Sequence, residues 1–170
     1  GRSRETDMAV WAAEEKIRQL RGSFLETILS LAIAAEWKGQ DSRRHPKRVA
    51  EISAAIAAKL GLDSDRIETL RLAAVMHDVG KGALNEGVKD RTGDFTEADR
   101  NEMRRHSVAG ERMLRDHENE ILALAASIAK SHHERWDGSG YPEGLKGEQI
   151  PLESRIVAVA DVFDALTSAR

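Results

Sequence analysis

Cysteine is absent from the 170-residue sequence, which excludes disulfide bridges and thiolate metal sites. A cysteine-free chain also fits a reducing compartment, and we expect a cytoplasmic location. No apolar run approaches the roughly 20 residues that a bilayer-spanning helix needs. The longest candidate, residues 24–35, is interrupted by Glu26, Thr27 and Ser30, and the N-terminus lacks the apolar core of a signal peptide. We therefore expect a soluble chain that does not insert into a membrane.

Basic charge is not in excess either, since the formal net charge is −3. Without a broad basic surface, duplex nucleic acid is not expected as a partner. A small anionic ligand remains compatible with this charge, because a metal cluster supplies positive charge locally. The length and the 41% hydrophobic content suit one domain with its own core.

Aromatic residues are scarce at 4%, while alanine and leucine are common and β-branched runs are short. This composition predicts an all-α fold. Residues 1–22 are polar with sparse apolar positions, which indicates a linker helix arriving from an upstream domain. An amphipathic helix should follow from Phe24 to about Trp37, within a domain over residues 23–170. The N-terminal helix could pair with its copy, so the oligomeric state is open.

Prolines, glycines and polar caps predict where the helices begin and end. Pro46 is tolerated only in the first turn of a helix, so His45 should lie at a helix entrance. Asp63 or Ser64 should cap a helix that continues to Gly80.

The second half of the chain contains three further helices by the same reasoning. Thr96 and Asp99 resemble a capping box that opens a helix to about residue 116, and another helix is expected over 118–131. Pro151 suits the first turn of the last helix. The apolar face predicted for this last helix comprises Ile156, Val159, Ala160, Phe163 and Leu166.

The six histidines are the main candidates for chemistry: His45, His77, His106, His117, His132 and His133. His77 and Asp78 are adjacent, and imidazole with carboxylate suits iron, manganese or zinc; a carboxylate can also bridge two ions. Taken alone, the pair could equally have a structural role, with a hydrogen-bonded histidine at the end of a helix. Asp41 and His45 would share one helix face, or form a cap beside a surface histidine.

Further along the chain, His132 and His133 end an alanine-rich helix, where adjacent side chains point about 100° apart. Such a pair can reach two different ions. Asp161 is expected on the apolar face of the last helix, where a buried carboxylate needs a partner or a metal. His106 lies in a polar context that by itself favours a solvated surface position.

Taken together, these segments resemble the HD-GYP branch of the HD phosphohydrolase superfamily over about residues 25–170. The segments that carry the resemblance are, in order, His45 with Arg48 and Val49, "HDVGK" at 77–81, His106 with Gly110, "HHERWDGSGYP" at 132–142, "IPLESRI" at 150–156 and "VADVFDALTSAR" at 159–170.

This resemblance implies a compact helical bundle of the HD-domain type that holds two or three divalent ions, commonly iron or manganese. The implied metal ligands are His45, His77, Asp78, His106, His132, His133 and Asp161. Asp78 would bridge ions. Asp41 stands where a glutamate ligand for a third ion is expected, so the third ion stays open. The domain is expected to be truncated near its C-terminal end, with further ligand contacts beyond Arg170.

The activity implied by the resemblance is hydrolysis of cyclic di-GMP to pGpG, with continuation to GMP left open. Attack by a metal-activated hydroxide would use Asp78 and Lys81 as catalytic residues, and Lys81, Tyr141 and Arg170 would contact the substrate. Lys81 could instead be a stabilising cation at a helix C-terminus. The loop of Tyr141 could meet diguanylate cyclase (GGDEF) domains, and a sensory or receiver domain is expected upstream.

Two other functions are compatible with the sequence. The domain could hydrolyse another nucleotide, or it could bind a cyclic dinucleotide or a protein partner without turnover. The segment 82–95 departs from the family pattern, because it lacks a proline and places Arg91 near an expected lysine. Substrate affinity could therefore differ from that of the family.

Overall fold

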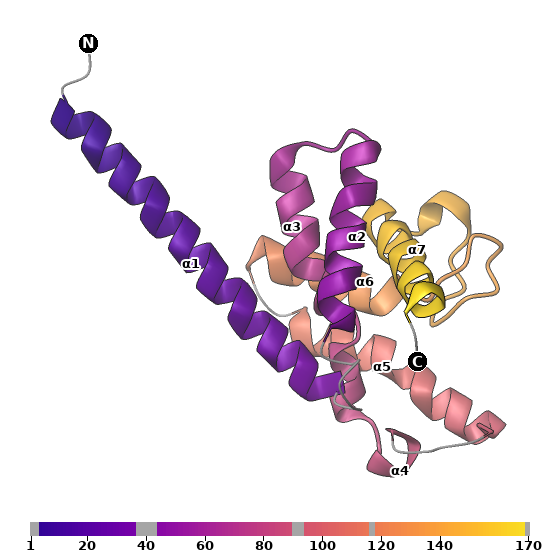
Figure 1. Ribbon diagram of the computed structural model, residues 1–170. Coiled ribbons are helices and arrows are strands. Elements are labelled where there is room, and N and C mark those ends of the chain that lie inside the picture. The colour runs from indigo at the N-terminus through magenta and orange to yellow at the C-terminus, as the bar shows by residue number, and fades with distance from the viewer. Residues whose placement is uncertain (1–3, 37–43, 90–93, 116–117, 169–170) are drawn as a thin grey trace.

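The computed structural model describes residues 4–36, 44–89, 94–115 and 118–168 (Figure 1). These residues form helices joined by turns and loops and contain no strand, which confirms the predicted all-α class. The α-helices are α1 (Arg4–Glu36), α2 (His45–Lys59), α3 (Ser64–Ala74), α4 (Glu86–Lys89), α5 (Glu97–Leu114), α6 (Glu120–Ser131) and α7 (Leu152–Thr167). Two 3₁₀ helices, η2 (Val79–Ala83) and η3 (Gly147–Gln149), lie between them.

Helices α2, α3, α5, α6 and α7 pack into a bundle, while α1 extends away from it (Figure 1). The bundle core contains fully buried apolar side chains from four of these helices, among them Val49, Leu70, Ile128 and Val157. None of the helices in the described part of the chain is long and apolar enough to cross a membrane.

The N-terminal helix is continuous, whereas the sequence suggested a linker helix followed by a second helix. α1 runs unbroken from Arg4 to Glu36 and passes through Gly22. Its C-terminal half buries Ile28 and Ala32 where the helix contacts η2 and α2. The expected end near Trp37 lies outside the described residues.

The predicted starts of α2, α3 and α5 are confirmed, whereas Pro151 is the N-cap of α7 and does not lie in its first turn. His45 and Pro46 open α2. The Asp63 carboxylate accepts a hydrogen bond from the backbone N–H of Arg66 at 2.9 Å and caps α3. Thr96 and Asp99 form the complete capping box of α5.

The end of α3 was predicted incorrectly, because the helix ends at Ala74 and does not reach Gly80. Tight turns follow, and residues 79–83 continue as the 3₁₀ helix η2. A Cβ added to Gly80 would lie 2.0 Å from the backbone oxygen of His106, so only glycine permits this approach of η2 to α5. The turns therefore bring His77 and Asp78 beside α5.

The orientation of α7 also differs from the prediction. Ile156 and Ala160 are buried as expected, but Val159, Phe163 and Leu166 are 61%, 54% and 81% exposed. The buried face instead includes Ser154, Val157 and Asp164. Polar contacts of Asp164 with α2, described below, accompany this orientation.

Candidate metal centre

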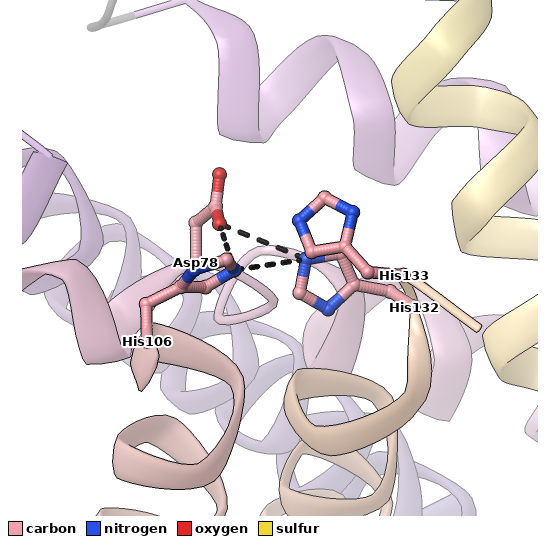
Figure 2. A group of neighbouring side chains, drawn as sticks. All are labelled: Asp78, His106, His132 and His133. Atoms are coloured by element: carbon pink, nitrogen blue, oxygen red, sulfur yellow. Dashed lines mark hydrogen bonds and ion pairs between the residues drawn. The ribbon is translucent and has the colours of Figure 1, made fainter. Parts of the chain in front are cut away.

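Seven histidine and aspartate side chains from separate segments converge in two neighbouring groups. One group comprises Asp78, His106, His132 and His133, and the other comprises His45, His77 and Asp161. Within each group, one possible ligand atom from every residue lies within 4.8 Å of the others. Figure 2 shows the first group, in which dashed lines join Asp78, His106 and His132 to one another and His133 lies beside His132.

Backbone carbonyls determine which ring nitrogen of three histidines faces the centre. The Nδ1 atoms of His77, His106 and His132 lie 2.8, 2.6 and 3.0 Å from the carbonyl oxygens of Ala74, Met103 and Ile128 respectively. A carbonyl only accepts, so each Nδ1 carries the proton and donates it. The Nε2 atom of each ring is then left with its lone pair, and this is the tautomer that a metal ligand needs.

A carboxylate performs the same role for His45. Nδ1 of His45 lies 2.8 Å from Oδ2 of Asp164, while Nε2 lies 3.3 Å from Oδ1 of Asp161. Asp164 is buried and also accepts two hydrogen bonds from the guanidinium of Arg48, at 2.5 and 2.9 Å. Asp164 therefore orients His45 and ties α7 to α2.

The buried Asp78 lies between the two groups. Its Oδ1 lies 3.2 Å from Nε2 of His106, and its Oδ2 lies 3.3 Å from Nε2 of His77 and pairs with the Lys81 ammonium. Burial raises the pKa of this carboxyl, but the positive charge of Lys81 and the contact with His77 outweigh burial and hold the pKa well below its usual value. Asp78 is thus ionised at neutral pH.

Two histidines of the first group, His106 and His133, are neutral at neutral pH. Burial lowers the pKa of His106 to about 4, because the attraction of Asp78 compensates only in part. Burial and the neighbouring His132 and His106 lower the pKa of His133 to about 2. Neutral imidazoles and an ionised carboxylate are the protonation states that divalent cations require of their ligands.

These observations fit a divalent metal centre. Oδ1 of Asp78 is buried without a hydrogen bond to any described residue, although a buried carboxylate oxygen normally has a partner. The donors are imidazole nitrogens and carboxylate oxygens, with no thiolate, a set that suits iron, manganese and zinc. The two groups adjoin at His77 and Asp78.

The loop that contains Gly140, Tyr141 and Pro142, which we call the Gly-Tyr-Pro loop, lies against one side of this centre. The Tyr141 ring stacks on His133, with ring centroids 4.8 Å apart. Burial and the charge of Asp78 raise the pKa of the Tyr141 hydroxyl, which therefore stays protonated. The buried Glu134 carboxylate holds the loop by accepting hydrogen bonds at 2.8–3.1 Å from the backbone N–H groups of Glu143, Gly144 and Leu145.

Most of the site residues predicted from the sequence lie at this centre. His106, for which a surface position was the simpler expectation, is buried with 1% exposure. Asp161 is half-buried, beside the apolar face of α7 that was expected to contain it. Asp41, His117 and Arg170 lie outside the described residues.

Three further residues at the centre were not identified as site residues from the sequence. Asp164 and Glu134 are buried carboxylates whose roles depend on partners distant in the sequence. Arg104 precedes His106 by two residues, and its guanidinium carbon lies 5.3 Å from the centroid of the Tyr141 ring. The periodicity of α5 could have placed Arg104 near His106, but not against the loop.

Comparison with known proteins identifies the family. The family model described as "HD domain" matches residues 28–170. This chain belongs to the HD domain family. Solved HD structures that resemble it include Bd1817, an HDG"Y"P protein of Bdellovibrio bacteriovorus, with a TM-score of 0.59, 26% identity and coverage of 72% of this chain and 40% of that one. The predicted HD-GYP assignment is confirmed.

Relatives of this HD domain include named phosphodiesterases. The cyclic di-GMP phosphodiesterase response regulator RpfG of Xanthomonas campestris is 45% identical over 85% of this chain and 38% of its own length. A cyclic di-GMP phosphodiesterase of Thermotoga maritima is 38% identical over 93% of this chain and 43% of its own. The 3'3'-cGAMP-specific phosphodiesterase 2 of Vibrio cholerae is 36% identical over 89% and 29%. The HD domain therefore spans less than half the length of these curated relatives.

The lowered histidine pKa values predict acid sensitivity of the metal-free domain. Between pH 6.5, near the usual histidine pKa, and pH 4, the unfolded chain binds a proton at His106 that the folded chain does not. The free energy of unfolding should therefore fall as the pH is lowered through this window, by on the order of 3 kcal/mol from His106 alone. Urea unfolding of chelator-treated protein at several pH values measures this effect.

The matched variant for this measurement is His106→Gln, which cannot titrate in this range. Its stability should depend less steeply on pH than that of the unmodified domain. An equally steep dependence in both proteins would contradict the assignment of the effect to His106.

Proposed function

We propose that this chain is a metal-dependent phosphodiesterase that hydrolyses cyclic di-GMP to pGpG. The observation that carries the proposal is the convergence of seven histidine and aspartate side chains in two adjoining groups, which meet at the ionised Asp78. The names of the relatives in Xanthomonas campestris and Thermotoga maritima support cyclic di-GMP as the substrate. Continuation to GMP remains open.

Two divalent ions, or three with Asp41, would be held by these residues, and iron or manganese suits the donors. His106, His132 and His133 would serve one ion and His45, His77 and Asp161 the other, with Asp78 shared between them. When bound, such ions supply a water nucleophile at neutral pH and neutralise phosphate charge. The carbonyls and Asp164 keep the histidine lone pairs directed at the centre throughout.

Lys81 and Tyr141 would then bind the substrate. Lys81 now pairs with Asp78 and is about one-third exposed, so its ammonium borders both the buried carboxylate and the outside. From there it would stabilise charge that develops on the phosphoryl oxygens. Tyr141 presents a protonated hydroxyl and a ring held against His133, and it would shape the pocket around a nucleobase or phosphate. Arg170 remains a predicted phosphate contact.

Another cyclic dinucleotide is the second candidate substrate. Relatives in Vibrio cholerae are named 3'3'-cGAMP-specific phosphodiesterases at 36% and 37% identity. A domain that binds cyclic dinucleotides without turnover is the non-enzymatic alternative. Every predicted metal ligand in the described part of the chain lies at the centre, which favours turnover over binding alone.

The deciding experiment is turnover by the purified chain after anaerobic reconstitution with iron(II) or manganese. Cyclic di-GMP and 3'3'-cGAMP are supplied separately and as an equimolar mixture, and the products are separated by chromatography. We expect pGpG to form and a chelator to suppress its formation. From the mixture, cyclic di-GMP should be consumed first. Faster consumption of 3'3'-cGAMP would identify that dinucleotide, and not cyclic di-GMP, as the preferred substrate. Metal binding without any product would contradict the enzymatic proposal.

Arg104 is expected to contribute to substrate affinity. Among the described residues it makes no ion pair with a carboxylate, whereas its neighbour Arg105 pairs with Glu102 at 2.7 Å. A cation beside Tyr141 is thus available for the second phosphate of a cyclic dinucleotide. Arg104→Ala should raise KM for cyclic di-GMP about tenfold with little change in kcat.

The control for this variant is Arg105→Ala, which removes a neighbouring arginine of the same helix whose charge is already paired. Steady-state kinetics of both variants should also include bis-p-nitrophenyl phosphate, which has a single phosphate and should be hydrolysed normally. Equal KM values for cyclic di-GMP in the two variants would contradict the role of Arg104.

Three protein partners are proposed on the basis of the sequence: an upstream domain, diguanylate cyclase domains and a second copy of this chain. A sensory or receiver domain upstream of α1 would regulate the activity, and the Gly-Tyr-Pro loop would meet diguanylate cyclase domains. A homodimer through the N-terminal helix is compatible with the length of α1.

A further inference from the structure

Helix α1 displays apolar residues at intervals of seven along its whole length. Val10, Ile17, Phe24 and Leu31 are each seven residues apart. A second row begins three residues after the first and comprises Ala13, Leu20, Thr27 and Ala34. We call these eight residues the seam. This spacing is the heptad pattern of a coiled coil, with the first row at a positions and the second at d positions.

The seam is exposed in the single chain. Val10, Ile17, Leu20 and Leu31 are 41%, 50%, 59% and 64% exposed, and Phe24 is 39% exposed. The residues by which α1 packs on the bundle lie beside the seam and not within it. At 100° per residue around the helix axis, the contact residues Ile28 and Ala32 lie about 40° and 80° from Phe24 in one direction. The residues at d positions lie in the other direction from Phe24.

The N-terminal half of α1 is not buried against the bundle. Every described side chain from Arg4 to Phe24 is exposed or half-exposed, and this half of the helix extends away from the other helices (Figure 1). Helices in proteins gain most of their stability from packing an apolar face. This half therefore lacks the packing that would stabilise it in the isolated chain.

We propose that a second copy of this chain covers the seam and forms a parallel, in-register, two-stranded coiled coil through α1. A second copy supplies a seam of the same pattern, so each apolar layer meets its equivalent. Val10 and Ile17 at a positions with Leu20 at d favour two strands over three or four. The proposal specifies the homodimer suggested above and does not depend on the reaction.

The size of the seam is sufficient for a dimer. From Val10 to Ala34 a helix spans about 37 Å at 1.5 Å per residue, and a strip one helix wide on both copies covers on the order of 1,000 Å². Specific interfaces begin near that area. The seam thus reaches the area that a specific dimer needs, and the two helical bundles would lie at the same end of the coiled coil.

The absence of cysteine makes the register directly testable in the full chain. In a parallel, in-register dimer, the single substitution Val10→Cys places the two new thiols in one layer, within the roughly 4.4–6.8 Å Cα separation that a disulfide needs. We expect oxidation to give a covalent dimer in high yield. An antiparallel pair would instead pack a positions against d positions and place Val10 near Ala34 of the second copy, so that only Val10→Cys combined with Ala34→Cys would cross-link. That outcome would overturn the proposal.

Sedimentation of the uncross-linked chain provides the second measurement. Ile17→Lys with Leu20→Lys places four charges in the seam of a dimer and should weaken dimerisation at least roughly 100-fold. The control is Met8→Lys, which introduces one positive charge per chain at an exposed position on the opposite side of α1. A monomeric unmodified chain at 100 µM, or equal weakening by the control, would overturn the proposal. Activity is not measured, so failure here leaves the phosphodiesterase assignment unaffected.

Discussion

Replacing Asp78 by alanine is expected to abolish divalent metal binding and phosphodiester hydrolysis while leaving the helical content nearly unchanged. The ionised carboxylate belongs to one ligand group and contacts both, since it lies 3.2 Å from His106 of its own group and 3.3 Å from His77 of the other. Without it the first ligand group has imidazoles alone, and the centre loses the carboxylate that contacts both groups. The loss in kcat/KM should reach about 10⁴-fold or more. His77→Ala should behave in the same way.

Metal content, circular dichroism and turnover should be measured on the same preparations. Asp65→Ala serves as the control, because this aspartate is exposed in the first turn of α3 and its loss should leave all three readouts near normal. If Asp78→Ala retained full activity with bound metal, the assignment of the centre would be wrong.

Replacing Asp164 by asparagine should destabilise the domain and weaken metal binding at the same time. The substitution removes the charge that receives two hydrogen bonds from Arg48 and one from His45. Arg48 is about one-third exposed, so the loss of stability should be about 2–3 kcal/mol, at the low end for a broken buried ion pair. A misoriented His45 should reduce metal affinity about 10–100-fold.

Asp161→Asn provides the matched comparison, three residues earlier on the same helix. Asp161 is half-buried and contacts His45 from the metal side, so its loss should reduce metal affinity but hardly change the stability of the metal-free protein. Chemical denaturation with a chelator and metal titration separate the two effects. An Asp164→Asn variant as stable as Asp161→Asn would show that Asp164 does not hold α7 to α2.

The local features of the fold were predictable because they depend on neighbouring residues. Pro46 marked the start of α2, Asp63 the cap of α3, and Thr96 with Asp99 the capping box of α5. The ligand set came from the resemblance of the ordered motifs to the HD-GYP family, since the local pattern around His106 by itself favoured a solvated position.

The orientation of α7 could not be predicted because the helix is apolar on more than one side. Periodicity favoured the side with Val159 and Phe163, but the partly buried pairing of Asp164 with Arg48 accompanies burial of a different side. That pairing joins residues 116 positions apart, so no local pattern contains it. The early end of α3 was missed for a similar reason, since Gly80 contacts α5 rather than closing a regular helix.

The two ligand groups draw on α2, the turns after α3, α5, the end of α6 and α7. Successive ligands along the chain are separated by about 30 residues, so bound ions would close several large loops and lower the conformational entropy of the unfolded chain. In a protein without cysteine, the centre would then act as a reversible cross-link that resembles a set of disulfides in its thermodynamic effect. Resistance to heat and proteolysis would follow metal supply rather than redox state.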